Sequence, residues 1–499
     1  MNLPAVLPVL IVATSLLVGL IIFALPEQRT GLRSTLNLTG AVVKLALVIL
    51  MLWGVFHGQH YQSELPLVPG IDLVLRIDPI SLLFVTLSSV LWLLTTIYAI
   101  GYLEGSPHRS RFFGFFSLCV AATAGVALSG NLITFLLFYE LLTLATYPLV
   151  VHRGSEVARR AGQVYLAYTL GGGALLLIGI VWLYSLTGDV TFTLGGLGDS
   201  LQGQSRPALI MIFALLIAGL GVKAALVPFH SWLPQAMVAP APVSALLHAV
   251  AVVKAGAFGI VLVLYEIFGI EFAAELGVTT PLTVLAAITI IYGSLRALSQ
   301  DDLKRRLAFS TVSQVSYIAL GVTILGPVAI VGGLVHLVHQ GLMKVTLFFC
   351  AGNLAETLGI HKISDMDGVG RRMPWTMSAF TLSALGMIGV PPLAGFITKW
   401  YLGLGALQAE QGWVLLVLIG SSLLNAAYFL PVLQRAWFRE PVGDWPRERH
   451  FGRKETAWLL LLPPLVTTAM AVGAGLFAAM PISPLQWVQF IVEGEGFIP

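Results

Sequence analysis

The sequence predicts an all-α membrane protein of about 14 transmembrane helices, arranged as two inverted five-helix repeats that each contain a proline-broken helix. Three observations predict this fold class. Hydrophobic residues make up 57% of the 499 residues and charged residues only 10%, whereas soluble domains carry about 25% charged residues. Apolar runs of about 20 residues, the length that crosses a bilayer, recur along the chain. Prolines interrupt two of these runs, and the composition excludes a soluble globular protein.

Apolar segments of spanning length occupy most of the chain. The first begins at Leu3 without a charged leader or a small-residue cleavage site, so we expect a retained membrane helix and not a signal peptide. The segment after Met480 is too short to span. The fourteen predicted spans lie near residues 3–25, 36–56, 77–100, 112–128, 131–151, 161–185, 208–236, 240–267, 280–299, 307–325, 328–352, 375–407, 411–435 and 456–478.

Loop charges predict the orientation in a cell (inner) membrane. With the N-terminus outside, the inside loops carry twenty of the 27 lysines and arginines, and the outside loops carry only Arg76 and Arg206. Because positive charge favours inside loops, we expect both termini on the outer face. The five remaining residues lie within spans and are all lysines: Lys44, Lys223, Lys254, Lys344 and Lys399.

Ionisable side chains inside the membrane are costly and usually functional. A buried lysine can give up its proton, whereas arginine stays charged, so a set of lysines without arginines favours groups that titrate. The spans also hold one clearly mid-span carboxylate, Glu140, and three mid-span histidines, His248, His336 and His339. Simpler interpretations remain open: headgroup snorkelling for Lys44 and Lys399, a neutral hydrogen-bonded acid for Glu140, and packed core histidines.

The seventh and twelfth spans are each interrupted by proline. In "GVKAALVPFHSWLPQA" Pro228 follows Lys223, and in "LGMIGVPPLAGFITKWYLGL" Pro391 and Pro392 precede Lys399. Five spans separate the two breaks, and an odd separation inverts the topology of the second unit. We expect the break at Pro228 to open backbone groups toward water beside Lys223, although two structural kinks would give the same pattern.

We expect four parts along the chain, and each of the two repeats contains one of the breaks. Residues 1–105 hold helices 1 to 3, and residues 106–267 hold a first repeat of helices 4 to 8. Residues 268–436 hold a second, inverted repeat of helices 9 to 13, and residues 437–499 hold a cytoplasmic loop and helix 14.

Several segments resemble the antiporter-like membrane subunits shared by respiratory complex I and the Mrp-type multisubunit cation/proton antiporters. The segment "VKAALVPFHSWLPQAMVAPAPVSALLHAVAVVKAGAFGI" is the most specific match. The resemblance spans roughly 75–435 and includes "FLLFYELLTLATYPLV", "DDLKRRLAFSTVSQVSYIALG", "LVHLVHQGLMKVTLFFCAGNL" and "GVPPLAGFITKWYL".

The resemblance implies a proton relay along the membrane midplane. It implies that Glu140 pairs with Lys223, that Lys254 continues the path, and that Lys399 ends it. It implies connecting roles for His248, His336 and Lys344. Many relatives carry a second histidine where this chain has Gln340, and His339 stands one position earlier. We therefore expect the residues in the middle of the relay to be connected differently in this chain.

Lys399 argues against the complex I subunit type that carries glutamate at this position, and the combination of His248 with Lys254 resembles the large Mrp subunit. The length and the ending of the chain are most similar to the D-type Mrp subunits, although "VPFHSWLPQA" differs from the commonest D-type sequence. The resemblance implies an ion transporter subunit, not an enzyme, that works with other membrane subunits and moves protons. The second ion stays open between Na⁺, K⁺, another solute and none. Two alternatives stay open: a proton-pumping subunit of a complex I-related redox or carbon-uptake complex, and a non-transporting scaffold. No cofactor or nucleic-acid motif is present in the sequence, and a metal is left undecided.

Overall fold

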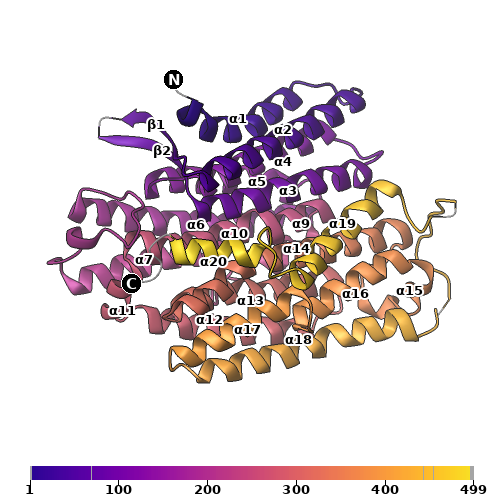
Figure 1. Ribbon diagram of the computed structural model, residues 1–499. Helices are drawn as coiled ribbons and strands as arrows, with labels where there is room; N and C mark the ends of the chain where they lie inside the picture. The colour runs from indigo at the N-terminus through magenta and orange to yellow at the C-terminus, as the bar shows by residue number, and fades with distance from the viewer. Residues whose placement is uncertain (1–2, 69, 442, 453, 495–499) are drawn as a thin grey trace.

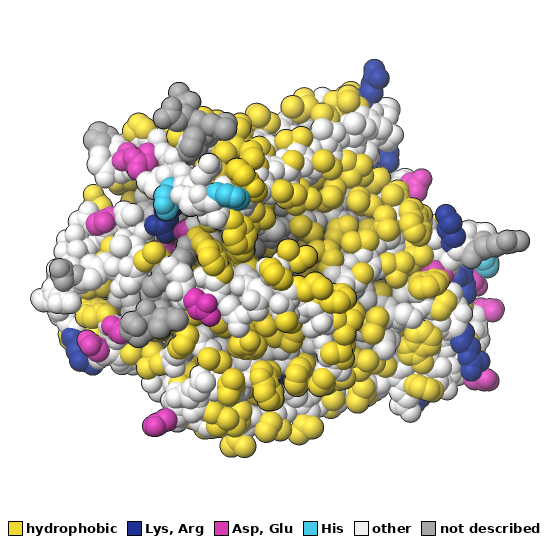
Figure 2. Space-filling model, in the orientation of Figure 1, with side chains coloured by type: hydrophobic (Ala, Val, Ile, Leu, Met, Phe, Trp, Pro, Cys, Tyr) yellow, Lys and Arg dark blue, Asp and Glu magenta, His cyan; other side chains and the backbone are white. Residues whose placement is uncertain are grey.

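The computed structural model describes residues 3–68, 70–441, 443–452 and 454–494. Its helices run side by side, with α1 and α2 along one flank and α17 and α18 along the opposite flank (Figure 1). On the face seen in Figure 2, apolar side chains cover the middle and charged side chains gather toward the edges where the helices end. This banding is what a bilayer requires of a bundle that crosses it, because the hydrocarbon core accepts apolar surface.

Within the described residues, twelve helices are long and apolar enough to cross a membrane. This confirms an all-α, multi-pass membrane protein. The twelve are α1 (Leu3–Phe23), α2 (Thr30–Phe56), α3 (Pro79–Tyr102), α4 (Arg109–Ala127), α5 (Leu132–Val150), α6 (Glu156–Thr187), α7 (Arg206–Lys223), the continuous stretch Ala241–Ile267, α12 (Thr279–Leu298), α14 (Pro327–Leu358), α18 (Trp413–Phe438) and α19 (Trp458–Leu476).

The other two predicted spans correspond to helices that are either more polar or shorter than the twelve. The tenth is α13 (Leu303–Thr323), whose buried side chains include several serines and threonines. The twelfth is split into α16 (Pro374–Ile388) and α17 (Ala394–Gln408), each of 15 residues. The proline break shortens each half below the length that spans alone.

Both predicted breaks are present. The seventh span stops when α7 ends at Lys223, and the chain turns through Pro228 before the short α8 (Trp232–Gln235). The twelfth span stops when α16 ends at Ile388. The peptide bonds Val227–Pro228 and Pro391–Pro392 are both cis. The inverted repetition of residues 106–267 and 268–436 stays a prediction.

The stretch Ala241–Ile267 is the most enclosed span and is not a uniform α-helix. It consists of α9 (Ala241–Ala245), a π-helical turn η3 (Leu246–Val250), α10 (Val252–Leu262) and a second π-helical turn η4 (Val263–Ile267). π-Helical turns are rare and are often found at functional sites. The first of these turns contains His248, and Lys254 follows in α10.

An antiparallel hairpin between α2 and α3 was not predicted from the sequence. It pairs β1 (Tyr61–Val68) with β2 (Ile71–Ile77), and Tyr61 faces Ile77 in the register. Pairing satisfies the backbone groups of this segment, which a hydropathy pattern reads only as a loop. The short elements are η1 (Gly198–Ser200), η2 (Ala236–Val238), α11 (Ile270–Glu275), η5 (Ile363–Asp365), α15 (Val369–Arg372) and α20 (Pro484–Gly494).

Candidate functional site

Lys223 is the last residue of α7, and its side chain is fully buried against α5. Its amine donates a hydrogen bond to the backbone carbonyl of Tyr139 and lies 3.3 Å from the centroid of the Tyr139 ring. The Tyr139 hydroxyl donates to the carbonyl of Gly219 at 3.0 Å, which ties α5 to the last turn of α7. Tyr139 therefore holds the amine through a carbonyl dipole and an aromatic face, both of which favour a cation. Nothing in the sequence pattern distinguishes Tyr139 from a core tyrosine.

Glu140 follows Tyr139, but its carboxylate packs against α6. A Cβ built on Gly173 of α6 would overlap Glu140 Oε1, so the carboxylate occupies the space that a side chain at Gly173 would need. Within the described part of the chain, Oε1 has no hydrogen-bond partner. Glu140 and Lys223 are close enough to interact electrostatically, but no ion pair within 4.0 Å joins them. The expected direct pair is not formed here, because the Tyr139 carbonyl takes the amine.

Side chains of α8 and α12 form hydrogen bonds with two backbone groups near the first break. The Trp232 indole N–H donates to the carbonyl of Val222 at 2.8 Å. The N–H of Val227 donates to the hydroxyl of Thr289 in α12 at 3.1 Å. These two groups are bonded to α8 and α12, and the expectation that water reaches other backbone groups of the break beside Lys223 stays a prediction. Pro228 itself is exposed.

Lys254 of α10 and His336 of α14 lie within electrostatic range of each other. The Lys254 side chain is fully buried, and its amine donates to the carbonyl of Leu337 at 2.9 Å. His336 immediately precedes Leu337 and interacts electrostatically with Lys254. No described carboxylate forms an ion pair with Lys254. A carbonyl thus stands where a charged lysine would normally have an anion.

His248 and Lys344 form the next part of this buried region. The His248 ring is fully buried and lies 4.5 Å from the ring of Phe348. Neither His248 ring nitrogen has a hydrogen-bond partner among the described residues. Lys344 is within electrostatic range of His248 and Lys254. An unpaired buried polar group costs about 1–3 kcal/mol, so this is a favourable place for a bridging water.

His339 has a side-chain partner in the second broken helix, whereas Gln340 has no hydrogen-bond partner among the described residues. The His339 ring Nδ1 lies 3.1 Å from the hydroxyl of Thr398 in α17, one residue before Lys399. The Gln340 amide is fully buried, and its nitrogen and oxygen find no partner in the portion of the chain described. The histidine shifted by one position therefore faces the second broken helix.

A chain of hydrogen bonds that the sequence did not predict connects Lys344 toward Lys399. The Lys344 amine donates to the Ser310 hydroxyl at 2.6 Å, and Ser310 lies 2.8 Å from the hydroxyl of Tyr428. Tyr428 donates to the Asn425 side chain at 2.8 Å, and the Asn425 amide donates to the carbonyl of Met387 at 3.1 Å. Lys399 reaches the same carbonyl at 3.4 Å. Ser310, Tyr428 and Asn425 come from α13 and α18, and no local pattern marks them as linked.

Lys399 binds the C-terminal end of the broken helix α16. Its amine donates to the carbonyl of Ile388 at 2.6 Å and to the hydroxyl of Ser422 at 2.7 Å. A cation at a helix C-terminus is stabilised by the exposed carbonyls and the helix dipole. Gly389 has a φ of 97°, and a Cβ there would lie 2.8 Å from Lys399 Cδ, so glycine makes room for the lysine. The Lys399 amine therefore binds protein groups, unlike that of a lysine snorkelling to headgroups.

Lys44 is also fully buried, so snorkelling is wrong for this residue. Its amine donates to the Ser15 hydroxyl at 3.1 Å and to the Val120 carbonyl at 3.4 Å. The Trp92 ring centroid lies 5.3 Å away.

Within the described residues, no group of three or more His, Cys, Asp or Glu side chains is arranged to hold a metal ion.

Comparisons with known proteins identify the family of this chain. Residues 129–425, which contain every residue from Glu140 to Lys399, match the family described as "NADH:quinone oxidoreductase/Mrp antiporter, TM", and residues 69–113 match "NADH-Ubiquinone oxidoreductase (complex I), chain 5 N-terminus". The chain is 37% identical over 447 residues to the N subunit of NADH-quinone oxidoreductase of Desulforudis audaxviator (strain MP104C), covering 85% of this chain and 86% of that protein.

Another relative is the D-type subunit of the Na(+)/H(+) antiporter of Alkalihalophilus pseudofirmus, 27% identical over 412 residues that cover 82% of this chain and 81% of that protein. A chain in the solved structure of the Mrp complex from Dietzia sp. DQ12-45-1b has the same fold, with a TM-score of 0.87 and 24% identity over 99% of this chain and 98% of that one. The protein therefore belongs to the NADH:quinone oxidoreductase/Mrp antiporter family, as an antiporter-like membrane subunit of the complex I and Mrp superfamily.

Proposed function

We propose that this protein is the proton-translocating subunit of a multisubunit Mrp-type monovalent cation/proton antiporter. The supporting observation is a series of buried lysines held by neutral acceptors instead of carboxylates. Lys223, Lys254 and Lys344 are fully buried, and their amines bind carbonyl or hydroxyl oxygens. A buried charge without a close counter-ion is costly, so its proton responds to small changes around it.

Proton transfer begins at Glu140 and Lys223. The Glu140 carboxylate stabilises the charged form of Lys223, and its movement away removes that stabilisation. At an effective dielectric constant of about 20, two unit charges that approached to 4 Å would interact by about 4 kcal/mol, so this pair, which lies beyond 4.0 Å, interacts by less than that and gains energy on closer approach. The membrane potential supplies about 2.3 kcal/mol per charge per 100 mV. A modest movement of the Glu140 carboxylate can therefore drive a proton against a comparable potential.

The proton then passes toward Lys254 through His248 and water, and on to Lys344 with the help of His336. His339 and the Ser310–Tyr428–Asn425 chain support its arrival at Lys399. The broken helices at Pro228 and at Pro391 and Pro392 position the two end lysines. Lys399 exchanges the proton with one side of the membrane.

The loop charges support both termini on the outer face of a cell membrane. Other membrane subunits are the proposed partners. Relatives named as antiporter subunits and a neighbour in a solved Mrp complex support this proposal. A second candidate is a proton-pumping subunit of a complex I-related redox complex, favoured by the 37% identity to an NADH-quinone oxidoreductase relative. Identification of the native complex after gentle detergent extraction distinguishes them: redox subunits favour the second candidate, and antiporter subunits favour the first.

The test of transport uses Glu140→Ala and Lys223→Ala. We expect each variant to assemble normally and to lose proton-coupled transport, measured by dye quenching in membrane vesicles. Native gels of the same membranes check the assembly. Transport at the wild-type rate in both variants would refute the relay, and it would favour a non-transporting scaffold.

A further inference from the structure

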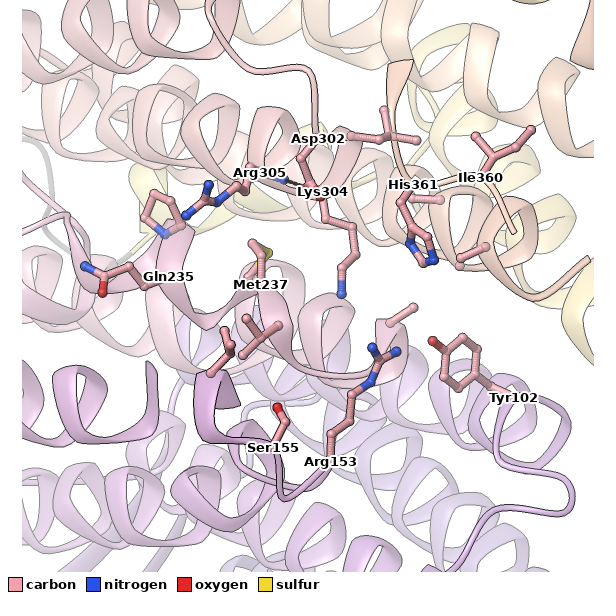
Figure 3. Close-up of a pocket in the computed structure, with 18 residues that line it drawn as sticks. Tyr102, Arg153, Ser155, Gln235, Met237, Asp302, Lys304, Arg305, Ile360 and His361 are labelled. Atoms are coloured by element: carbon pink, nitrogen blue, oxygen red, sulfur yellow. Dashed lines mark hydrogen bonds between the residues drawn. The ribbon is translucent and has the colours of Figure 1, made fainter. Parts of the chain in front are cut away.

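A cavity of about 500 Å³ lies at the end of the bundle where α13 begins and α14 ends (Figure 3). Helix ends from both halves of the chain line it. Tyr102 ends α3, Arg153 and Ser155 come from the turn between α5 and α6, Lys304 lies in the first turn of α13, and His361 follows α14. None of these residues belongs to the lysine series described above.

Basic groups converge on this cavity. The amine of Lys304 and the guanidinium of Arg153 extend toward each other from opposite walls, and the His361 ring and the Tyr102 hydroxyl point into the same space (Figure 3). The Lys304 amine is anchored by the carbonyl of Ala239 at 2.6 Å. In the described chain, neither Lys304 nor Arg153 forms an ion pair within 4.0 Å.

Two nearby carboxylates have hydrogen-bond or ion-pair partners of their own, although both interact electrostatically with His361 and Asp302 also with Lys304. Asp302 lines the cavity, but its carboxylate caps α13 by accepting the backbone N–H of Arg305 at 2.8 Å. Glu356 pairs with Arg449 at 3.4 Å. Burial, followed by the positive charges of Lys304 and Arg153, lowers the pKa of His361. Arg153, Lys304 and Arg305 line the cavity against a single acid, Asp302, so the lining carries a net positive charge.

We propose that this cavity binds a phosphate-bearing anion, either the headgroup of an anionic phospholipid or free inorganic phosphate. Arginine and lysine donate charge-assisted hydrogen bonds to phosphate oxygens, and arginine can do so through two N–H groups at once. Arg153 lies three residues beyond the end of α5, and Lys304 lies in the first turn of α13, so both stand at helix ends, where we expect lipid headgroups. Basic pockets between membrane helices are a known mode of binding anionic headgroups. Binding here does not depend on proton transport, so failure of the transport proposal leaves it untouched.

The test uses the purified, delipidated full chain in a neutral detergent at constant ionic strength, adjusted with chloride. The probes are inorganic phosphate, short-chain phosphatidylglycerol and short-chain phosphatidylcholine, and the readout is the midpoint of thermal unfolding against probe concentration. Arg153→Gln and Lys304→Gln remove the two converging cations. Arg159→Gln is the matched control, because Arg159 is an exposed arginine six residues away that does not line the cavity.

We expect saturable stabilisation of the wild type, at least tenfold weaker binding in Arg153→Gln and Lys304→Gln, and unchanged binding in Arg159→Gln. Stabilisation by phosphate as well as phosphatidylglycerol identifies a free-anion site, and stabilisation by phosphatidylglycerol alone identifies a headgroup site. Arg153 is exposed, so its replacement tests binding even if Lys304→Gln fails to fold. Absence of saturable stabilisation, or an equal loss of binding in Arg159→Gln, would overturn the proposal.

Discussion

The carboxylate of Glu140 lies in the space that a side chain on Gly173 would fill, since a Cβ built there would overlap Glu140 Oε1. Glycine at this position of α6 therefore leaves room for the Glu140 carboxylate within electrostatic range of Lys223. A flexible side chain can move away from a new methyl group, so the contact is a means of displacing Glu140 without removing it.

Gly173→Ala is expected to displace the Glu140 carboxylate and to reduce proton-coupled transport at least tenfold while the protein still folds. Gly171→Ala is the matched control, because a Cβ at Gly171 meets no atom within 4 Å. Dye quenching in vesicles at equal protein levels measures both variants. Equal rates in Gly173→Ala and wild type would mean that the position of Glu140 does not control transport.

Tyr428→Phe is expected to interrupt the link from Ser310 to Asn425 and to slow transport, because the hydroxyl is the shared hydrogen-bonding group. The loss of stability should be about 1 kcal/mol per hydrogen bond removed. Tyr98→Phe serves as the control, since the Tyr98 hydroxyl is also buried but donates to the carbonyl of Phe349, away from this chain. Similar transport defects in both variants, with similar losses of stability, would assign Tyr428 a structural role only.

Lys399→Arg is expected to preserve assembly and stop transport. Arginine keeps a positive charge beside the Ile388 carbonyl but cannot release a proton in the working pH range. Transport is followed from pH 6 to pH 9, with complex assembly checked by native electrophoresis. Normal transport across this range excludes proton release at Lys399, and the end of the path must then lie elsewhere.

His152 is expected to make folding stability depend on pH. It lies just beyond α5, where burial and then the nearby charges of Arg111, His108 and Arg153 lower its pKa to about 4, from an ordinary value of 6.5. Between these two values the unfolded chain binds more protons than the folded chain, so stability is complete above about pH 6.5 and falls as the pH drops toward 4.

Thermal unfolding of the detergent-solubilised protein between pH 7.5 and pH 4.5 measures this effect. His152→Phe should flatten the profile, and it keeps an aromatic ring beside Phe112, whose centroid lies 5.1 Å from that of His152. Replacement of the exposed His60 by glutamine should leave the slope unchanged. An identical slope in wild type and His152→Phe would remove His152 as the source.

Much of the site could be located before its geometry was known. The sequence alone identifies Lys223, Lys254, Lys344 and Lys399 as candidates. Each interrupts an apolar run, and a charged side chain inside a membrane has a high free-energy cost. The proline breaks are equally local, since proline removes a backbone donor wherever it stands. The resemblance to antiporter-like subunits added the expected order of the relay residues.

The partners of these lysines were not predictable. Lys223 binds the carbonyl of Tyr139 rather than the carboxylate of Glu140, and Lys344 reaches toward Lys399 through Ser310, Tyr428 and Asn425. These contacts join helices that are far apart in the chain, and serine, tyrosine and asparagine in an apolar helix carry no local signal of what they face.

The sequence by itself determined the membrane class, the spans, the two breaks and the positions of the ionisable groups. In a bilayer a regular spanning helix satisfies its backbone within itself, so composition and length are enough to define the twelve long apolar spans. Only the tertiary structure decided how these groups are held: the glycine that admits Glu140, the half-helix end that receives Lys399, and the basic cavity around Lys304. The reason is that a side chain's acceptors and charges come from neighbouring helices, and helix packing, not residue order, determines which neighbours it meets.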